Sequence, residues 1–490
     1  MQLRFPRRQV RLPDGHHFAV TWGIPDDFGG MTNAMLHRSR AFVRLGGQSV
    51  DIVTFDARPD YPQLEARLRE QGQLIDGVRI VNLWDWLRSN PLPGGSLKLS
   101  SHPFLPLDET DDTTTTRSRD GHVLSRTRHA ADGKTVLQND YYRIDGTLLA
   151  SDRRDVKERG TLGGRSVVLC DAQGQPVRSW GGVWQLYRSW LDALTAGEQS
   201  WMIVDSKTIA NFMLTYRRRS VVTAHVVHAS HLSGTARPHG TLRESRRTVF
   251  EELDKYDAVI VLSERQRQDI EILLGKHKNV RVVPNSRDFP DIPADAAPRP
   301  QDRGIFLGSL TARKRPEHAI RALAAARTPA GASVSLDLYG GGELTAAMET
   351  VIEDLGAADA IRLHGHDPAA RDRLLDSSFL VMTSTSEGFP LVLVESLAAG
   401  CLPIVYDIPY GPADIIRDGW NGYLVPDGDQ AAVTAAVERL LSLPQAEVER
   451  MRANARSSAR RFSDEEVTRE WAAELQRAAR RKRVKPSLRA

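Results

Sequence analysis

The sequence has little cysteine and no long apolar run. Only Cys170 and Cys401 occur among the 490 residues, which excludes a disulfide framework and fits a reducing cytosol. No apolar stretch approaches the roughly 20 residues that a membrane-spanning helix needs. The segment from Met1 to Asp14 is charged and has no apolar core, so we expect no signal peptide. These absences predict a cytoplasmic protein.

An excess of charge of one sign is also missing. The formal net charge is +4, from 66 Lys and Arg against 62 Asp and Glu. No basic run is interleaved with aromatic residues, which argues against nucleic acid as a partner. The one dense basic cluster, Arg480 to Lys485, is typical of a disordered, solubilising tail. The alternative is attraction to an anionic polymer or to the inner face of the plasma membrane, where the protein would be peripheral.

A dinucleotide fingerprint is absent too. Tyr339 is followed by three glycines at the end of a predicted strand, without the Gly-x-Gly-x-x-Gly spacing. This argues against NAD and against a nucleotide oxidoreductase.

What the sequence does contain is an alternation of strands and helices. A strand over 17–23, a loop over 24–32, a helix over 33–45 and a strand over 49–55 follow the order of a doubly wound α/β domain. The alternation returns after residue 200 and again from residue 304. With 41% hydrophobic residues the chain can bury two or three cores. We predict the α/β class, with two doubly wound Rossmann-like domains that face a cleft.

Between the first α/β segments the pattern changes. Asp120-Gly121, Asp132-Gly133 and Asp145-Gly146 recur at 12–13 residue spacing between strand-like runs, and Gln173-Gly174 adds a fourth turn. Asx-Gly pairs favour tight hairpins. We predict an antiparallel β-meander inserted in the N-terminal domain, with a structural, oligomerising or polymer-docking role.

The proline-rich segment 290–302 is the best candidate for an interdomain linker. The predicted bounds are 1–80 with 196–291 for the N-terminal Rossmann-like domain, 81–195 for the inserted β-meander, 297–463 for the C-terminal Rossmann-like domain, and 464–490 for a C-terminal helix and basic tail.

Two carboxylates, Glu387 and Glu395, stand eight positions apart across the start of a predicted helix. Pro390 suits a first helical position, because its missing N–H would be unpaired there anyway, and Gly400 can end the helix with a left-handed cap. Glu395 would lie on an otherwise apolar helix, where a carboxylate is costly unless something pairs with it. Because a helix N-terminus attracts phosphate, the pattern suggests a sugar-nucleotide site.

Two further loops carry candidate binding residues. Gly29 and Gly30 let the backbone approach a ligand closely, although a tight turn explains them equally well. Arg313 and Lys314 follow a predicted strand and form a natural diphosphate clamp, with a solvated basic loop as the alternative.

Three histidines, His225, His228 and His231, lie on or after another predicted strand. No Cys, Asp or Glu partner has ligand spacing, so we expect no metal. We favour His228 or His231 as a hydrogen-bonding or charge-stabilising group in the cleft over a purely structural role.

Together these residues resemble a retaining GT-B glycosyltransferase of family 4 over most of the chain. The narrower signature looks like that of the bacterial wall teichoic acid α-glycosyltransferases, which act on poly(glycerol-phosphate) or poly(ribitol-phosphate). Serine-rich-adhesin O-GlcNAc transferases are similar and share the insert. The segments that carry the narrower signature are Gly29–Thr32, Val227–His231, Val283–Ser286 and Tyr410–Ile416.

The resemblance implies transfer of glucose or N-acetylglucosamine from UDP-glucose or UDP-N-acetylglucosamine to a hydroxyl of a polyol-phosphate cell-wall polymer or glycan, with retention. The N-terminal domain would bind the acceptor and the C-terminal domain the nucleotide sugar. The resemblance also implies a homo-oligomer formed through the β-insert. Alternatives are a family 4 enzyme that acts on another glycan or a protein serine, and an inactive subunit that binds polymer.

The resemblance also implies roles for individual residues. Glu395 would bind the ribose hydroxyls and Glu387 the hydroxyls of the transferred sugar. Lys314 would neutralise the leaving diphosphate, which the backbone amides of Leu391 and Val392 would face.

Three further positions follow in the same way. Gly30 would lie against the β-phosphate and Gly365 by the uracil. His228, or else His231, would touch the reacting face of the sugar.

One position departs from the family. Ser309 stands where the family usually has an arginine, five residues before Lys314, so Arg313 or Arg315 would have to supply that charge. Because the lysine and the helix N-terminus can stabilise leaving UDP, we expect activity without added metal.

Overall fold

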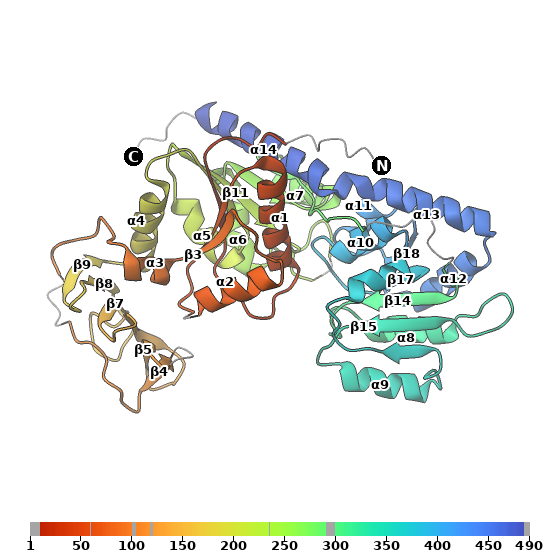
Figure 1. Ribbon diagram of the computed structural model, residues 1–490, viewed down its shortest axis with the longest axis horizontal. Helices are drawn as coiled ribbons and strands as arrows, with labels where there is room; N and C mark the ends of the chain where they lie inside the picture. The colour runs from red at the N-terminus through yellow and green to blue at the C-terminus, as the bar shows by residue number, and fades with distance from the viewer. Residues whose placement is uncertain are drawn as a thin grey trace. The chain divides into compact units, whose positions relative to one another are not determined.

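The computed structural model describes residues 10–58, 60–99, 104–117, 121–234, 236–290 and 299–484 (Figure 1). The chain separates into two compact units. Unit 1 comprises Met1–Leu12, Asn33–Ala41 and Ala224–Ala490, and unit 2 comprises Pro13–Thr32 and Phe42–Thr223. These units are not the predicted domains, which number four segments with other bounds. The predicted domain bounds therefore stay a prediction. Most of the predicted linker, at 291–298, lies outside the described residues.

Unit 1 contains a six-stranded parallel sheet with the strand order β16-β15-β14-β17-β18-β19 (Figure 1). Its central strands are short apolar runs that are buried throughout, as expected for parallel strands covered on both faces. The strands are β14 (Arg303–Leu307), β15 (Ser335–Tyr339), β16 (Ile361–Leu363), β17 (Phe379–Met382), β18 (Leu402–Tyr406) and β19 (Tyr423–Val425). The helices that alternate with them are α8 (Pro316–Ala325), α9 (Thr345–Asp354), η3 (Ala370–Leu375), α10 (Leu391–Ala399), α11 (Pro412–Ile415) and α12 (Gln430–Leu441).

Unit 1 also contains β12 (Ala258–Val261), which pairs in parallel with β13 (Val280–Val282) and, from Ala224 onward, with β11 (Val221–Val227). The remaining helical segments of this unit are η1 (Glu244–Arg246), α6 (Arg247–Glu251), η2 (Leu253–Lys255), α7 (Glu264–Leu274), α13 (Gln445–Ala459), η4 (Arg460–Phe462) and α14 (Asp464–Val484).

Unit 2 begins with the predicted strand–loop–helix–strand order. β1 (His16–Val20) pairs in parallel with β10 (Ser200–Val204) and β2 (Val50–Thr54), and β2 pairs with β3 (Val78–Asn82). The helices are α1 (Gly30–Gly46), part of which belongs to unit 1, α2 (Tyr61–Glu70), α3 (Leu83–Ser89), α4 (Val183–Thr195) and α5 (Lys207–Thr215). The prediction of doubly wound α/β segments in the N-terminal half is confirmed.

The predicted β-meander is present in unit 2 as a six-stranded antiparallel sheet in sequence order (Figure 1). Asp132 Oδ1 accepts the N–H of Thr135 over 2.8 Å, and Gly133 next to it has a φ of 64°. These two features explain why an Asp-Gly pair produces a turn here. The strands are β4 (Thr113–Arg117), β5 (Val123–His129), β6 (Val136–Tyr142), β7 (Leu148–Arg153), β8 (Ser166–Cys170) and β9 (Pro176–Trp180).

Helix α10 differs slightly from its prediction. It begins at Leu391, with Pro390 as the N-cap rather than the first helical residue. The predicted end is confirmed, because Gly400 caps the helix with a φ of 71°.

The C-terminal basic cluster, Arg480 to Lys485, differs more from its prediction. Helix α14 extends to Val484, so a disordered tail is wrong for 480–484, whereas Lys485 lies outside the described residues. Arg481 Nε donates to the carbonyl of Asp257 over 3.2 Å, and Lys482 Nζ to its Oδ2 over 2.9 Å. The buried Asp257 thus binds two of the charges that were expected in solvent. No helix in the described ranges is long and apolar enough to cross a membrane.

Candidate functional site

Lys314 and Glu387 meet at the carboxyl edge of the parallel sheet in unit 1. Lys314 follows β14 and Glu387 follows β17, and these two strands pair with each other. Strand pairing therefore joins loops that are 73 residues apart in sequence. Lys314 Nζ donates to Glu387 Oε1 over 2.7 Å, and Arg313 Nη1 lies 3.0 Å from the same oxygen. The Lys314 and Glu387 side chains are 16% and 11% exposed, and Arg313 is half exposed.

The electrostatics of this cluster keep Glu387 ionised. Burial alone would raise the pKa of Glu387, but the charges of Lys314 and Arg313 outweigh burial and hold that pKa below its ordinary value. An ionised Glu387 can accept hydrogen bonds at neutral pH and cannot donate a proton. The side chain is therefore suited to bind hydroxyl groups and unsuited to general-acid catalysis.

The start of α10 lies directly after Glu387. Leu391 and Val392 are its first residues and are half-buried. The first N–H groups of a helix have no intrahelical partner and carry partial positive charge, so they favour an anion. Lys314, Arg313 and this helix start thus gather positive charge around one ionised carboxylate.

Glycine loops pack against one another at the same edge. The N–H of Gly340, after β15, donates to the carbonyl of Gly365, after β16, over 2.7 Å. A Cβ on Gly340 would lie 2.0 Å from the carbonyl oxygen of Gly308, after β14, so only glycine fits there. Gly365 itself has a φ of 69°, and a Cβ on it would meet no atom within 4 Å. Gly365 therefore presents an uncovered backbone face.

Glu395 has the partner that a carboxylate on an apolar helix requires. Arg287 Nε donates to Glu395 Oε1 over 2.7 Å, and the two side chains are 11% and 14% exposed. Arg371 Nε lies 3.9 Å from the same oxygen. The sequence interpretation missed both arginines. Arg287 could have been suspected, because it directly follows the segment Val283–Ser286 that carries the resemblance.

Removing this partner should destabilise the fold. Arg287→Ala is expected to lower the free energy of unfolding by about 2–4 kcal/mol, because it removes the hydrogen-bonded partner of a largely buried carboxylate and leaves only Arg371 at 3.9 Å. Urea unfolding measures the change. The double variant Arg287→Ala/Glu395→Gln removes the charge together with its partner and should recover most of the loss. Equal unfolding free energies for wild type and Arg287→Ala would mean that water already satisfies Glu395.

The two candidate histidines lie in different surroundings. His231 is fully buried, its ring stacks on Phe250 and Tyr410, and burial lowers its pKa to about 4. His228 is only partly buried, and its carbonyl oxygen would lie 1.9 Å from a Cβ on Gly388, the residue after Glu387. The main chain at His228 therefore touches the Glu387 loop. This placement favours His228 over His231 as the residue that meets a ligand.

Arg313, and not Arg315, supplies the second positive charge at Glu387. Arg315 Nε and Nη2 donate to the carbonyls of Thr383 and Ser384, each over 2.8 Å, which commits Arg315 to bracing the chain after β17. Ser309 is exposed. Across the described ranges, no group of three or more His, Cys, Asp or Glu side chains is placed to hold a metal ion.

Residues 291–458 match the family described as glycosyl transferases group 1. The matched range contains Lys314, Glu387 and Glu395, and Arg287 lies just before it. The chain carries a group 1 glycosyl transferase domain.

Similarity to known proteins extends beyond this domain. An exopolysaccharide phosphotransferase of Streptomyces coelicolor is 32% identical over 220 residues, which are 44% of this chain and only 23% of that protein. The poly(ribitol-phosphate) α-N-acetylglucosaminyltransferase of Staphylococcus aureus is 23% identical over 491 residues, covering 90% of this chain and 96% of that enzyme. A solved structure of a variant of S. aureus TarM, in complex with fondaparinux, α-GlcNAc-glycerol and UDP, matches with a TM-score of 0.68 at 19% identity, covering 94% of this chain and 100% of that chain. The chain therefore has the GT-B fold and is similar along its length to teichoic acid α-glycosyltransferases.

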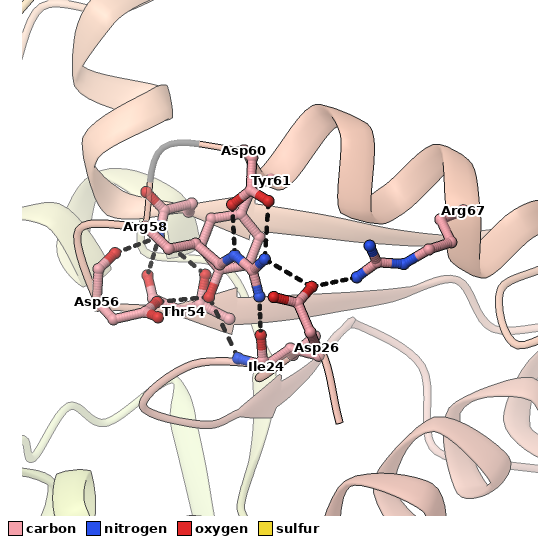
Figure 2. A network of polar contacts seen from close by, with 9 residues as sticks. Ile24, Asp26, Thr54, Asp56, Arg58, Asp60, Tyr61 and Arg67 are labelled. Atoms are coloured by element: carbon pink, nitrogen blue, oxygen red, sulfur yellow. Dashed lines mark hydrogen bonds and ion pairs between the residues drawn. The ribbon is translucent and has the colours of Figure 1, made fainter. Parts of the chain in front are cut away.

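Outside the group 1 domain, the loop that leads to Gly29-Gly30 in unit 2 is anchored by side chains (Figure 2). Arg58 Nη1 donates to the carbonyl of Ile24 over 2.6 Å, and Arg58 Nη2 to Asp26 Oδ1 over 3.0 Å. The N–H of Ile24 donates to the hydroxyl of Tyr61 over 3.3 Å. Both main-chain groups of Ile24 are thus bound, which fixes the chain before the glycines. The expected contact of Gly30 with a phosphate stays a prediction.

Proposed function

We propose that the chain transfers glucose or N-acetylglucosamine from a UDP-sugar to a hydroxyl of a polyol-phosphate cell-wall polymer, with retention of configuration. The observation that carries this proposal is the Lys314–Glu387 pair at the start of α10, where cationic groups and an ionised acceptor lie side by side. A sugar diphosphate offers the matching groups, an anion and several hydroxyl donors. The similarity to the poly(ribitol-phosphate) transferase of S. aureus supports the acceptor class.

In the proposed reaction the bond between the sugar and the UDP diphosphate breaks through an oxocarbenium-like state. Negative charge develops on the departing phosphate, and Lys314 with the amides of Leu391 and Val392 stabilises that charge more in the transition state than in the ground state. Arg313 supplies the positive charge that the arginine usual in the family, replaced here by Ser309, would provide. The acceptor hydroxyl attacks from the face that UDP leaves, and the departing phosphate takes its proton.

The other residues bind and orient the donor. Glu387 accepts hydrogen bonds from the sugar hydroxyls, and His228 contacts the reacting face of the sugar. Arg287 binds Glu395 through Oε1, so Oε2 accepts from the ribose hydroxyls. The uncovered backbone of Gly365 lies by the uracil.

A panel of UDP, UDP-glucose and UDP-N-acetylglucosamine tests the donor. A ligand at 100 times its Kd stabilises the folded state by about 2.7 kcal/mol, so the matching UDP-sugar should raise the melting temperature clearly. UDP release should continue in EDTA. Failure of every UDP-sugar to stabilise the protein would overturn the proposal. Loss of activity in EDTA with recovery in Mg²⁺ would overturn metal independence alone.

The acceptor is tested separately. Purified poly(ribitol-phosphate), poly(glycerol-phosphate) and a serine-rich peptide are offered with the donor that binds. Transfer to a polyol-phosphate polymer supports the proposal, whereas transfer to the peptide alone assigns the chain to protein glycosylation. Donor binding without any UDP release would indicate an inactive, polymer-binding subunit.

A further inference from the structure

Tyr410 is joined to Glu387 through the backbone. The N–H of Glu387 donates to the carbonyl of Pro409 over 3.0 Å, and the N–H of Tyr410 donates to the carbonyl of Glu387 over 2.8 Å. These two bonds fix the main chain of Glu387 on both sides of its Cα. A shift of the main chain at Tyr410 would therefore strain or break a bond to Glu387.

The side chain of Tyr410 is itself held in a buried triad. Tyr410 is fully buried, and its hydroxyl donates to Asp269 Oδ2 over 2.7 Å. Arg237 Nε donates to the same carboxylate oxygen over 2.5 Å, and the Arg237 guanidinium lies 5.0 Å from the centre of the Tyr410 ring. Asp269 thus anchors Tyr410 to helix α7.

Helix α7 also holds the residues around Tyr410. Asp414 Oδ1 accepts the N–H of Glu264, the first residue of α7, over 2.6 Å. This N–H has no partner within the helix, so the Asp414 carboxylate satisfies it. Arg265 forms an ion pair with Asp407. The segment 407–414 is therefore docked on α7 on both sides of Tyr410 and at Tyr410 itself.

We propose that Tyr410, anchored by Asp269, is a positioning residue that sets the location of the Glu387 carboxylate against Lys314 and the donor sugar. The proposal rests on the proposed function for the role of Glu387. Misplacement of a reacting group by about 1 Å can cost about 10²-fold in rate, so a rigid support for Glu387 has kinetic value. Tyr410 acts through Glu387 and does not itself touch the substrate.

Tyr410→Phe tests this by deleting the hydroxyl alone. We expect kcat to fall about tenfold, a loss readily measured and smaller than that for deleting Glu387 itself. Affinity for UDP should be unchanged, because UDP is bound at Glu395 and the start of α10. Affinity for the UDP-sugar relative to UDP should fall, since only the sugar meets Glu387. A purely structural role would not separate these two affinities.

Unit 2 offers a matched control. Tyr216, also fully buried, donates to Asp192 Oδ1 over 3.0 Å, Arg218 pairs with Asp192 at 2.7 Å, and Arg218 lies 5.1 Å from the centre of the Tyr216 ring. Tyr216→Phe deletes the corresponding bond from a triad whose Arg218 and Asp192 side chains are 36% and 41% exposed. It should lower stability by no more than Tyr410→Phe does, and leave kcat per folded molecule and the ratio of the two affinities unchanged.

Hydrogen exchange gives a readout that needs no activity. The amides over 386–389 should exchange faster in Tyr410→Phe and not in Tyr216→Phe. Unchanged exchange, or a wild-type kcat and affinity ratio in Tyr410→Phe, would overturn the proposal. If Tyr410→Phe does not fold, Asp269→Asn, which keeps the side-chain shape, is judged by the same criteria. Lack of UDP-sugar binding by the wild type would overturn the proposed function, and the exchange result would still decide whether Tyr410 supports Glu387.

Discussion

Lys314→Ala is expected to lower kcat by about 10²–10³-fold, the usual cost of deleting one preorganised group that stabilises developing charge. Lys314 is 16% exposed, so its charge acts in a poorly solvated place, and the variant leaves Arg313 as the other cation at Glu387. Affinity for UDP should fall less than kcat, because the other proposed nucleotide contacts, the amides at the start of α10 and Glu395, are kept. Turnover at saturating donor and UDP titration measure the two effects.

Arg321→Ala is the control for removing a positive charge from the same unit. Arg321 pairs with Glu317 on helix α8 at 2.8 Å, and both side chains are 45% exposed. An exposed pair of this kind contributes less than about 1 kcal/mol, so this variant should keep the wild-type kcat and melting temperature. A wild-type kcat in Lys314→Ala as well would remove Lys314 from the reaction and leave Arg313 as the remaining cation.

The parts of the fold that depend on local sequence were predictable. The helix predicted over 33–45 and the strand predicted over 49–55 correspond to α1 (Gly30–Gly46) and β2 (Val50–Thr54), because hydrophobic periodicity is a local signal. The turn at Asp132-Gly133 could also be predicted from local sequence, since a single Asp–Gly pair supplies both the side-chain acceptor and the residue with left-handed backbone conformation.

The pairing of charged side chains could not be predicted in this way. Glu395 and Arg287 are 108 residues apart, and Tyr410 and Asp269 are 141 residues apart. The sequence indicated that Glu395 needs a partner, because its helix is apolar, but not which of many arginines would reach it. The basic cluster shows the same limit. The charge of the cluster suggested that its side chains lie in solvent, whereas Arg481 binds the main-chain carbonyl of the buried Asp257 and Lys482 binds its carboxylate.

Glu387→Gln is expected to lower kcat by about 10–100-fold, because a hydrogen bond to a charged acceptor contributes about 1.5–3 kcal/mol. Glutamine keeps the shape of the side chain and one carbonyl acceptor, and it removes the negative charge between Lys314 and Arg313. Some stability should be lost, since the carboxylate at 11% exposure balances both cations. Turnover per folded molecule, corrected by the melting temperature of each variant, isolates the kinetic effect.

The pattern of affinities decides what Glu387 does. If Glu387 binds the donor sugar, Glu387→Gln weakens the UDP-sugar and leaves UDP nearly unchanged, because the proposed contacts of UDP, at Glu395 and the start of α10, do not include Glu387. Lys314→Ala should instead weaken UDP and the UDP-sugar to a similar extent, since in the proposed site its charge acts on the diphosphate that both ligands share. Equal losses of UDP and UDP-sugar affinity in Glu387→Gln, with a wild-type kcat, would reduce Glu387 to an ion-pair partner that merely holds Lys314 in place. The two variants together therefore separate sugar binding from charge stabilisation at a single pair of side chains 2.7 Å apart.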